Sequence, residues 1–177
     1  MSVAPISLIG WLHTAVCVAA MAAGAVALCT RKGSARHRRC GRWYVGTMIA
    51  AQLTALLIYT GEGFRIFHWL AVIALLLVAL GAIAAPRQAR LPWFLAHVSG
   101  MVWSYYLLVG GAVNEAFLRL PVLWPVSPFD GGPSHYHASA HMAVLLFFTA
   151  CWAAFVGRRL QRRRPAHSRR LAPEAEA

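Results

Sequence analysis

A dense basic segment at residues 31–44 constrains this chain most strongly, because it lies between two apolar runs. It reads RKGSARHRRCGRWY and holds six Lys and Arg residues. So much positive charge is costly to place in a lipid bilayer and is typical of the cytoplasmic side of a membrane protein. Placing this segment in the cytoplasm assigns a side of the membrane to every other loop. The resulting topology decides which polar side chains lie on the same side and can contact one another.

The composition is that of a membrane protein. Of the 177 residues, 59% are hydrophobic and 12% are charged, whereas a soluble domain carries about 25% charged residues. Each helical crossing takes roughly 20 residues, so the length allows one bundle. The net charge of +12 lies between apolar runs rather than on a face with base-reading side chains. We therefore expect the lipid bilayer, other membrane proteins or a second copy as partners, and no nucleic acid.

Five apolar runs are long enough to be membrane spans. They cover residues 5–29, 43–60, 66–85, 91–113 and 138–157. With the N-terminus outside and the C-terminus in the cytoplasm, fifteen of the seventeen Lys and Arg residues fall on the cytoplasmic side. This asymmetry follows the positive-inside rule. The sequence predicts an all-α integral membrane protein: residues 1–157 form one bundle of five transmembrane helices, and residues 158–177 form a basic, disordered cytoplasmic tail.

Histidines in the predicted spans are the main candidates for chemistry, because ionisable groups are expensive to bury in a membrane. His13, His68 and His141 all fall in the outer half of the bundle. A b-type haem needs two neutral imidazoles at similar depth on facing helices. His13 with His68 is the best predicted ligand pair, and His13 with His141 is the second. An interhelical hydrogen bond is the alternative for each.

His97 is a further candidate cofactor ligand, but it lies near the inner end of the fourth span. Only His37, in the basic segment, has a similar depth. The pattern therefore does not favour a second haem on the inner side.

Small residues follow His13 along one face of the first span. Cys17, Ala20 and Gly24 are spaced four, three and four residues from it in turn. Such a stripe leaves room for a flat ring below the histidine, or it is a plain helix-packing face.

A divalent metal at the outer surface is a competing hypothesis. His137 and His141 are four residues apart at the start of the fifth span, on one helical face, a spacing that suits zinc or copper. Histidines that cap a helix at the interface are the alternative. The candidates to complete such a site are His135, Asp130, Glu62 and Glu115.

Glu115 and Arg119 are also four residues apart, with the acid first, the favourable order for an ion pair on a helix. The functional alternative is a charged gate over an outer cavity.

No nucleophile elbow, phosphate loop or dinucleotide fingerprint is present, so the sequence does not establish an enzyme. Electron transfer through one b-type haem is the leading hypothesis. A non-enzymatic accessory or metal-binding membrane subunit is the alternative. A transporter ranks last, because the inner half offers few polar residues.

Two ordered sets of residues resemble an uncharacterised family of predicted bacterial membrane proteins, a domain of unknown function. The resemblance covers residues 10–119 and implies a location in the bacterial inner (plasma) membrane, without an activity. The family is similar in general plan to small haem-binding cytochrome bundles. The matching residues are His13, Lys32, Gly33, Ser34, His37, Arg38, Gly41, Arg42, Tyr44 and Met48, then His97, Met101, Ser104, Tyr105, Glu115 and Arg119.

The order of residues in the basic segment indicates more than a topology anchor. Gly33 and Gly41 would permit a tight turn that presents His37 and Arg38 at the inner face, beneath His97. We therefore expect this segment to form a folded cap on the bundle.

Overall fold

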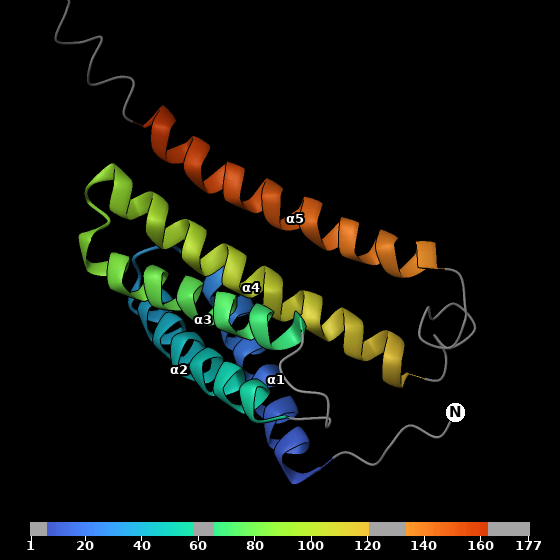
Figure 1. Cartoon of the computed structure of the whole chain (residues 1–177). Coiled ribbons are helices and arrows are strands. Elements are labelled where there is room, and N and C mark those ends of the chain that lie inside the picture. Colours follow the sequence, from blue (N-terminus) through green and yellow to red (C-terminus); the bar gives the residue numbers. More distant parts are fainter. Residues whose placement is uncertain (1–6, 59–65, 121–133, 163–177) are drawn as a thin grey trace, which may run out of the picture.

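The computed structural model describes residues 7–58, 66–120 and 134–162, and all regular structure in these ranges is helical (Figure 1). The predicted positions Glu62 and Asp130, and residues 163–177 of the predicted tail, lie outside them. The helices are α1 (Leu8–Cys29), α2 (Ala35–Leu57), α3 (Ile66–Ala84), the 3₁₀ turn η1 (Ala85–Arg87), α4 (Leu91–Arg119) and α5 (Ser134–Gln161).

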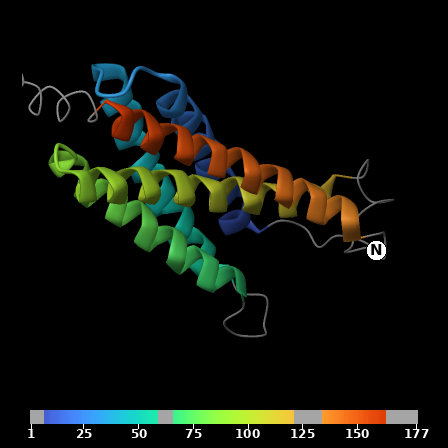
Figure 2. The same ribbon diagram turned by 90° about the horizontal axis from the view of Figure 1, so that it is seen from above.

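The five α-helices form an antiparallel bundle in which each packs on the next along the chain (Figures 1 and 2). α4 is the central helix, because it contacts α1, α3 and α5. It also has the most buried residues of any helix. The polar side chains of α4 can therefore form hydrogen bonds with neighbouring helices instead of facing lipid.

Three helical segments are long and apolar enough to cross a membrane: Leu8–Cys29, Ile66–Arg87 and His135–Gln161. The other two predicted spans are present as helices but lack that composition. α2 begins with a run of arginines, and α4 carries polar residues along the faces that its neighbours cover.

Three helices differ from the predicted boundaries. α5 begins at Ser134 rather than at 138, so His141 lies in its second turn and not its first. α2 begins at Ala35 rather than at 43, so most of the basic segment is helical. α4 continues past 113 to Arg119, so its last turns include the polar residues that follow the apolar run.

The predicted turn in the basic segment is confirmed at Gly33 and wrong at Gly41. Gly33 has a positive φ of 79°, which favours glycine. Ser34 then caps α2, because its hydroxyl accepts a hydrogen bond from the His37 backbone N–H at 3.1 Å. Gly41 lies within the helix. Positive charge excludes these residues from lipid but not from a helix.

The backbones of α3 and α4 approach each other closely at Gly100. A Cβ atom on Gly100 would lie 2.5 Å from the Leu77 carbonyl oxygen and 2.6 Å from the Gly81 nitrogen. Both are backbone atoms, so no side-chain rotation relieves the clash. Gly100 is therefore required for this packing.

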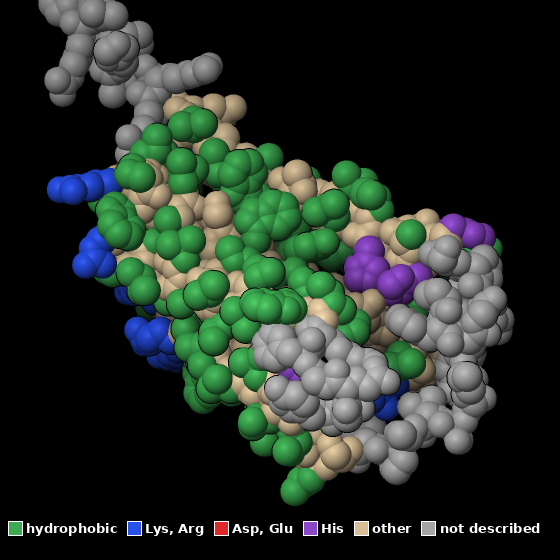
Figure 3. Space-filling model, viewed as in Figure 1, with side chains coloured by type: hydrophobic (Ala, Val, Ile, Leu, Met, Phe, Trp, Pro, Cys, Tyr) green, Lys and Arg blue, Asp and Glu red, His purple; other side chains and the backbone are tan. Residues whose placement is uncertain are grey.

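The surface separates by chemistry along the bundle axis. Large apolar side chains such as Trp11, Phe67, Leu76 and Leu146 are exposed on the sides of the helices. Soluble proteins rarely expose apolar patches of this extent. In Figure 3 most of the visible Lys and Arg side chains gather at one end, and the visible histidines lie toward the other. We call these the basic end and the histidine end.

Candidate functional site

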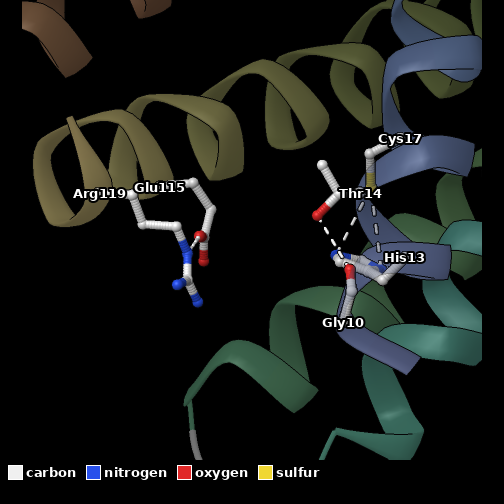
Figure 4. Close-up of polar contacts among 6 residues, drawn as sticks. All are labelled: Gly10, His13, Thr14, Cys17, Glu115 and Arg119. Atoms are coloured by element: carbon white, nitrogen blue, oxygen red, sulfur yellow. Dashed lines mark hydrogen bonds and ion pairs between the residues drawn. The ribbon is translucent and has the colours of Figure 1, made fainter. Parts of the chain in front are cut away.

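His13 is held by α2 at the histidine end. Its Nδ1 atom lies 3.1 Å from the Ala51 carbonyl oxygen and 3.0 Å from Thr54 Oγ1. Because a carbonyl oxygen only accepts, Nδ1 carries the proton. Nε2 is then the unprotonated nitrogen of the neutral ring, 3.5 Å from the Cys17 sulfur (Figure 4).

His68, the other predicted haem ligand, is buried in the first turn of α3 with 6% of its surface exposed. α1 and α3 each pack on α2 and share no extensive interface. His13 and His68 therefore belong to two helices that both pack on α2, and both lie near the histidine end.

The small-residue stripe on α1 is a helix-packing face. Ala20 and Gly24 are buried, and a Cβ atom on Gly24 would lie 2.6 Å from the Tyr105 ring. The Tyr105 hydroxyl donates to the Met21 carbonyl oxygen at 2.8 Å. The expectation that this stripe leaves room for a flat ring is wrong, because the Tyr105 side chain fills the space.

A buried polar contact joins α2 and α4 in the middle of the bundle. The hydroxyls of Tyr44 and Ser104 lie 2.8 Å apart, and both residues are buried. The rings of Tyr44 and Tyr105 meet edge to face, with centroids 5.7 Å apart. Met48 is fully buried beside them. Several residues that carry the family resemblance are thus interior contacts between helices.

Lys32 and His37 close the basic end of α1. Lys32 Nζ donates to the Ala27 carbonyl oxygen at 3.0 Å and to that of Leu28 at 2.6 Å, and it lies 4.8 Å from the centroid of the Phe155 ring. His37 Nδ1 donates to Ala27 as well, at 3.0 Å. Together these side chains satisfy carbonyl groups that a helix end leaves without partners. The predicted folded cap is present in this form.

Burial lowers the pKa of both cap side chains, Lys32 and His37. For His37 the hydrogen bond to Ala27 opposes this effect, whereas Lys32, the nearby His97 and Arg38 lower the pKa further. Arg38 itself donates to the Gly33 carbonyl oxygen. A depressed pKa favours the neutral imidazole, in keeping with its role as a hydrogen-bond donor to a helix end.

His97 joins α4 to α3 at the basic end. Its Nδ1 atom donates to the Gly81 carbonyl oxygen at 2.8 Å. This contact lies on the same close α3–α4 interface that requires Gly100.

His137 and His141 meet on Asn114, a residue that the sequence did not single out. Their Nε2 atoms lie 2.8 Å and 3.1 Å from the Asn114 side-chain oxygen. The two imidazole rings pack edge to face, with their centroids 4.6 Å apart. The amide oxygen accepts both bonds, so the three side chains form a clamp between α4 and α5. The one available signal was a polar residue directly after the apolar run at 91–113.

The structure does not assemble the predicted metal ligands into a larger site. Within residues 7–58, 66–120 and 134–162, no group of three or more His, Cys, Asp or Glu side chains is placed to hold a metal ion. Glu115 instead pairs with Arg119, with 2.5 Å between Nε and Oε2. This ion pair on α4 is confirmed, and Figure 4 shows it apart from His13.

The comparisons with known proteins point to a membrane location and to no activity. A family model described as "Predicted membrane protein (DUF2306)" matches residues 10–133. No curated protein and no solved structure shows a significant match.

Proposed function

Because the chain belongs to the family of predicted membrane proteins designated DUF2306, we propose that it is a multi-pass protein of the bacterial inner membrane. In this proposal all five α-helices cross the membrane, the histidine end faces outward and the basic end faces the cytoplasm. The apolar sides of the helices and the gathering of Lys and Arg at one end support it.

Reporter fusions test this topology. A reporter enzyme active only outside the cytoplasm should be active when inserted at position 63 and inactive at the C-terminus. The reverse pattern, or activity at the C-terminus, would contradict the proposed orientation.

We further propose that the protein transfers electrons through one b-type haem, which His13 and His68 would hold at the histidine end. The observation that carries this is the anchoring of His13. Its Nδ1–H donates to a backbone carbonyl, which leaves Nε2 with its lone pair. Histidines that bind metals are held in the same way by a hydrogen bond from the other ring nitrogen. A bound haem supplies one-electron redox chemistry.

The side chains around His13 restrict where such a site lies. The Tyr105 ring packs against Gly24, so a haem held by His13 would have to lie on the side of His13 toward the histidine end. Ala51 and Thr54 fix the tautomer and the orientation of the His13 ring. Cys17 lies on the Nε2 side and would have to move aside for an iron atom.

An absorption spectrum of the purified protein tests the haem proposal. Protein from haem-replete cells should show a Soret band, and an α band on reduction. His13→Ala and His68→Ala should each lose most of the bound haem. His135→Ala, an exposed position at the same end, is the matched control and should keep it. A colourless wild-type preparation would overturn the proposal.

A non-enzymatic accessory or metal-binding subunit is the second candidate. A specific observation favours it: five histidines already have hydrogen-bond partners within the bundle, namely His13, His37, His97, His137 and His141. Metal analysis of the same preparations distinguishes a metal site from a purely structural role of the histidines. Bound zinc or copper that falls in His137→Ala and His141→Ala would support a metal site. Protein without haem or metal would support a purely structural role for these histidines.

A further inference from the structure

A groove of about 420 Å³ follows the surface between α1 and α2. It starts near the basic end and runs toward the middle of the bundle. Its chemistry changes along this path, from charged through aromatic to small and mostly apolar. The residues that line it are Arg39, Arg42, Trp43, Gly46, Thr47, Ala50 and Val16.

The order of these residues along α2 matches the order of groups in a phospholipid. Arg39 and Arg42 are three residues apart, so they share one helical face. Ala50 lies roughly 12 Å beyond Arg42 at the ~1.5 Å rise per residue of a helix. Trp43 is exposed beside the arginines, where tryptophan commonly marks the boundary between headgroups and acyl chains. The groove thus has a cationic mouth and an apolar floor.

The arginines at the mouth have no acidic partner in the part of the chain that the structure describes. Glu115 is the one acidic residue among those positions, and it pairs with Arg119 near the opposite end of the bundle. An external anion is therefore the available counter-charge. A phosphate group suits two arginines well, because guanidinium groups bind phosphate oxygens through paired, charge-assisted hydrogen bonds.

The floor is open where it would hold an acyl chain. A Cβ atom on Gly46 would have no atom within 4 Å. The absence of a side chain here keeps the groove continuous without being needed for the packing of α1 on α2.

We propose that this groove binds one anionic phospholipid, with its phosphate between Arg39 and Arg42 and an acyl chain along Gly46 and Ala50. The site is independent of any haem. It also gives Arg42, one of the residues that carry the family resemblance, a role different from that of the inward-facing Tyr44.

Native mass spectrometry of the detergent-purified full chain tests this proposal, with phosphatidylglycerol as the probe and phosphatidylcholine for comparison. The double variant Arg39→Gln/Arg42→Gln should bind phosphatidylglycerol about 30-fold more weakly, the equivalent of about 1 kcal/mol for each arginine. Gly46→Phe should lower the affinity for both lipids, because it fills the floor. Its melting temperature should match that of the wild type, which separates loss of the groove from loss of the fold.

The matched control is Arg31→Gln/Arg36→Gln, which removes the same charge from exposed positions outside the groove. It should keep the wild-type affinity. An equal loss in this control would show non-specific attraction to basic residues and overturn the proposal. Complete displacement of the lipid by millimolar inorganic phosphate would also overturn it, since it would indicate a site for small anions. A dimer that becomes monomeric in Gly46→Phe would assign the groove to a second copy of the chain instead.

Discussion

Gly100→Ala should destabilise the bundle by about 3 kcal/mol or more, because the added methyl group cannot be accommodated. It would lie 2.5 Å from the Leu77 carbonyl oxygen and 2.6 Å from the Gly81 nitrogen. Relief requires α3 and α4 to separate along their shared interface. The measurements are the melting temperature in detergent and the yield of monodisperse protein from size-exclusion chromatography.

Gly111→Ala is the control on the same helix. A Cβ atom at this exposed position has nothing within 4 Å. Alanine is favoured over glycine in a helix by up to about 1 kcal/mol, so this variant should be as stable as the wild type or more stable. Equal melting temperatures for Gly100→Ala and Gly111→Ala would contradict the close α3–α4 packing.

Asn114→Leu should release the first two turns of α5 from α4. The substitution removes the acceptor of both histidine hydrogen bonds in the clamp. Leaving a fully buried donor without its acceptor costs about 1–3 kcal/mol, and these two donors are partly buried, so the lower part of that range applies. α5 packs on α4 and on no other helix to a comparable extent, so the effect should be local. Hydrogen exchange of the amides in residues 135–141 should accelerate by about tenfold or more.

Asn114→Asp tests whether the acceptor oxygen is what matters. A carboxylate offers an oxygen in the same place, so the clamp should persist and exchange should stay slow. Fast exchange in both variants would indicate that the amide nitrogen matters instead. Unchanged exchange in Asn114→Leu would show that apolar packing alone holds α5.

The helices were predictable to the extent that local signals define them. The third span was expected at 66–85 and α3 covers Ile66–Ala84, because an unbroken apolar run ends at Pro86, which α-helices do not readily accommodate. The start of α2 was missed because the charge pattern suggested a loop. The capping serine at Ser34 was the better signal, since it satisfies the first free backbone N–H groups of the helix.

The candidate site was predictable only where its contacts are local. The Glu115–Arg119 pair was foreseen, because residues four apart on a helix are neighbours wherever the helix lies. His137 and His141 were placed on one face for the same reason. Their partner Asn114 comes from another helix, 23 and 27 residues earlier in the chain, and no local spacing indicates it.

The sequence by itself determined that this is a helical membrane protein with its positive charge at one end, because hydrophobicity and charge act through solvation, whatever the neighbours are. Only the tertiary structure decided what the polar residues do. His13 meets α2 through residues 38 and 41 positions away, and the Tyr105 hydroxyl meets Met21 across 84 positions. Such contacts depend on how helix surfaces fit together. The fit of Tyr105 against Gly24 closed the space that the small-residue stripe had suggested for a cofactor.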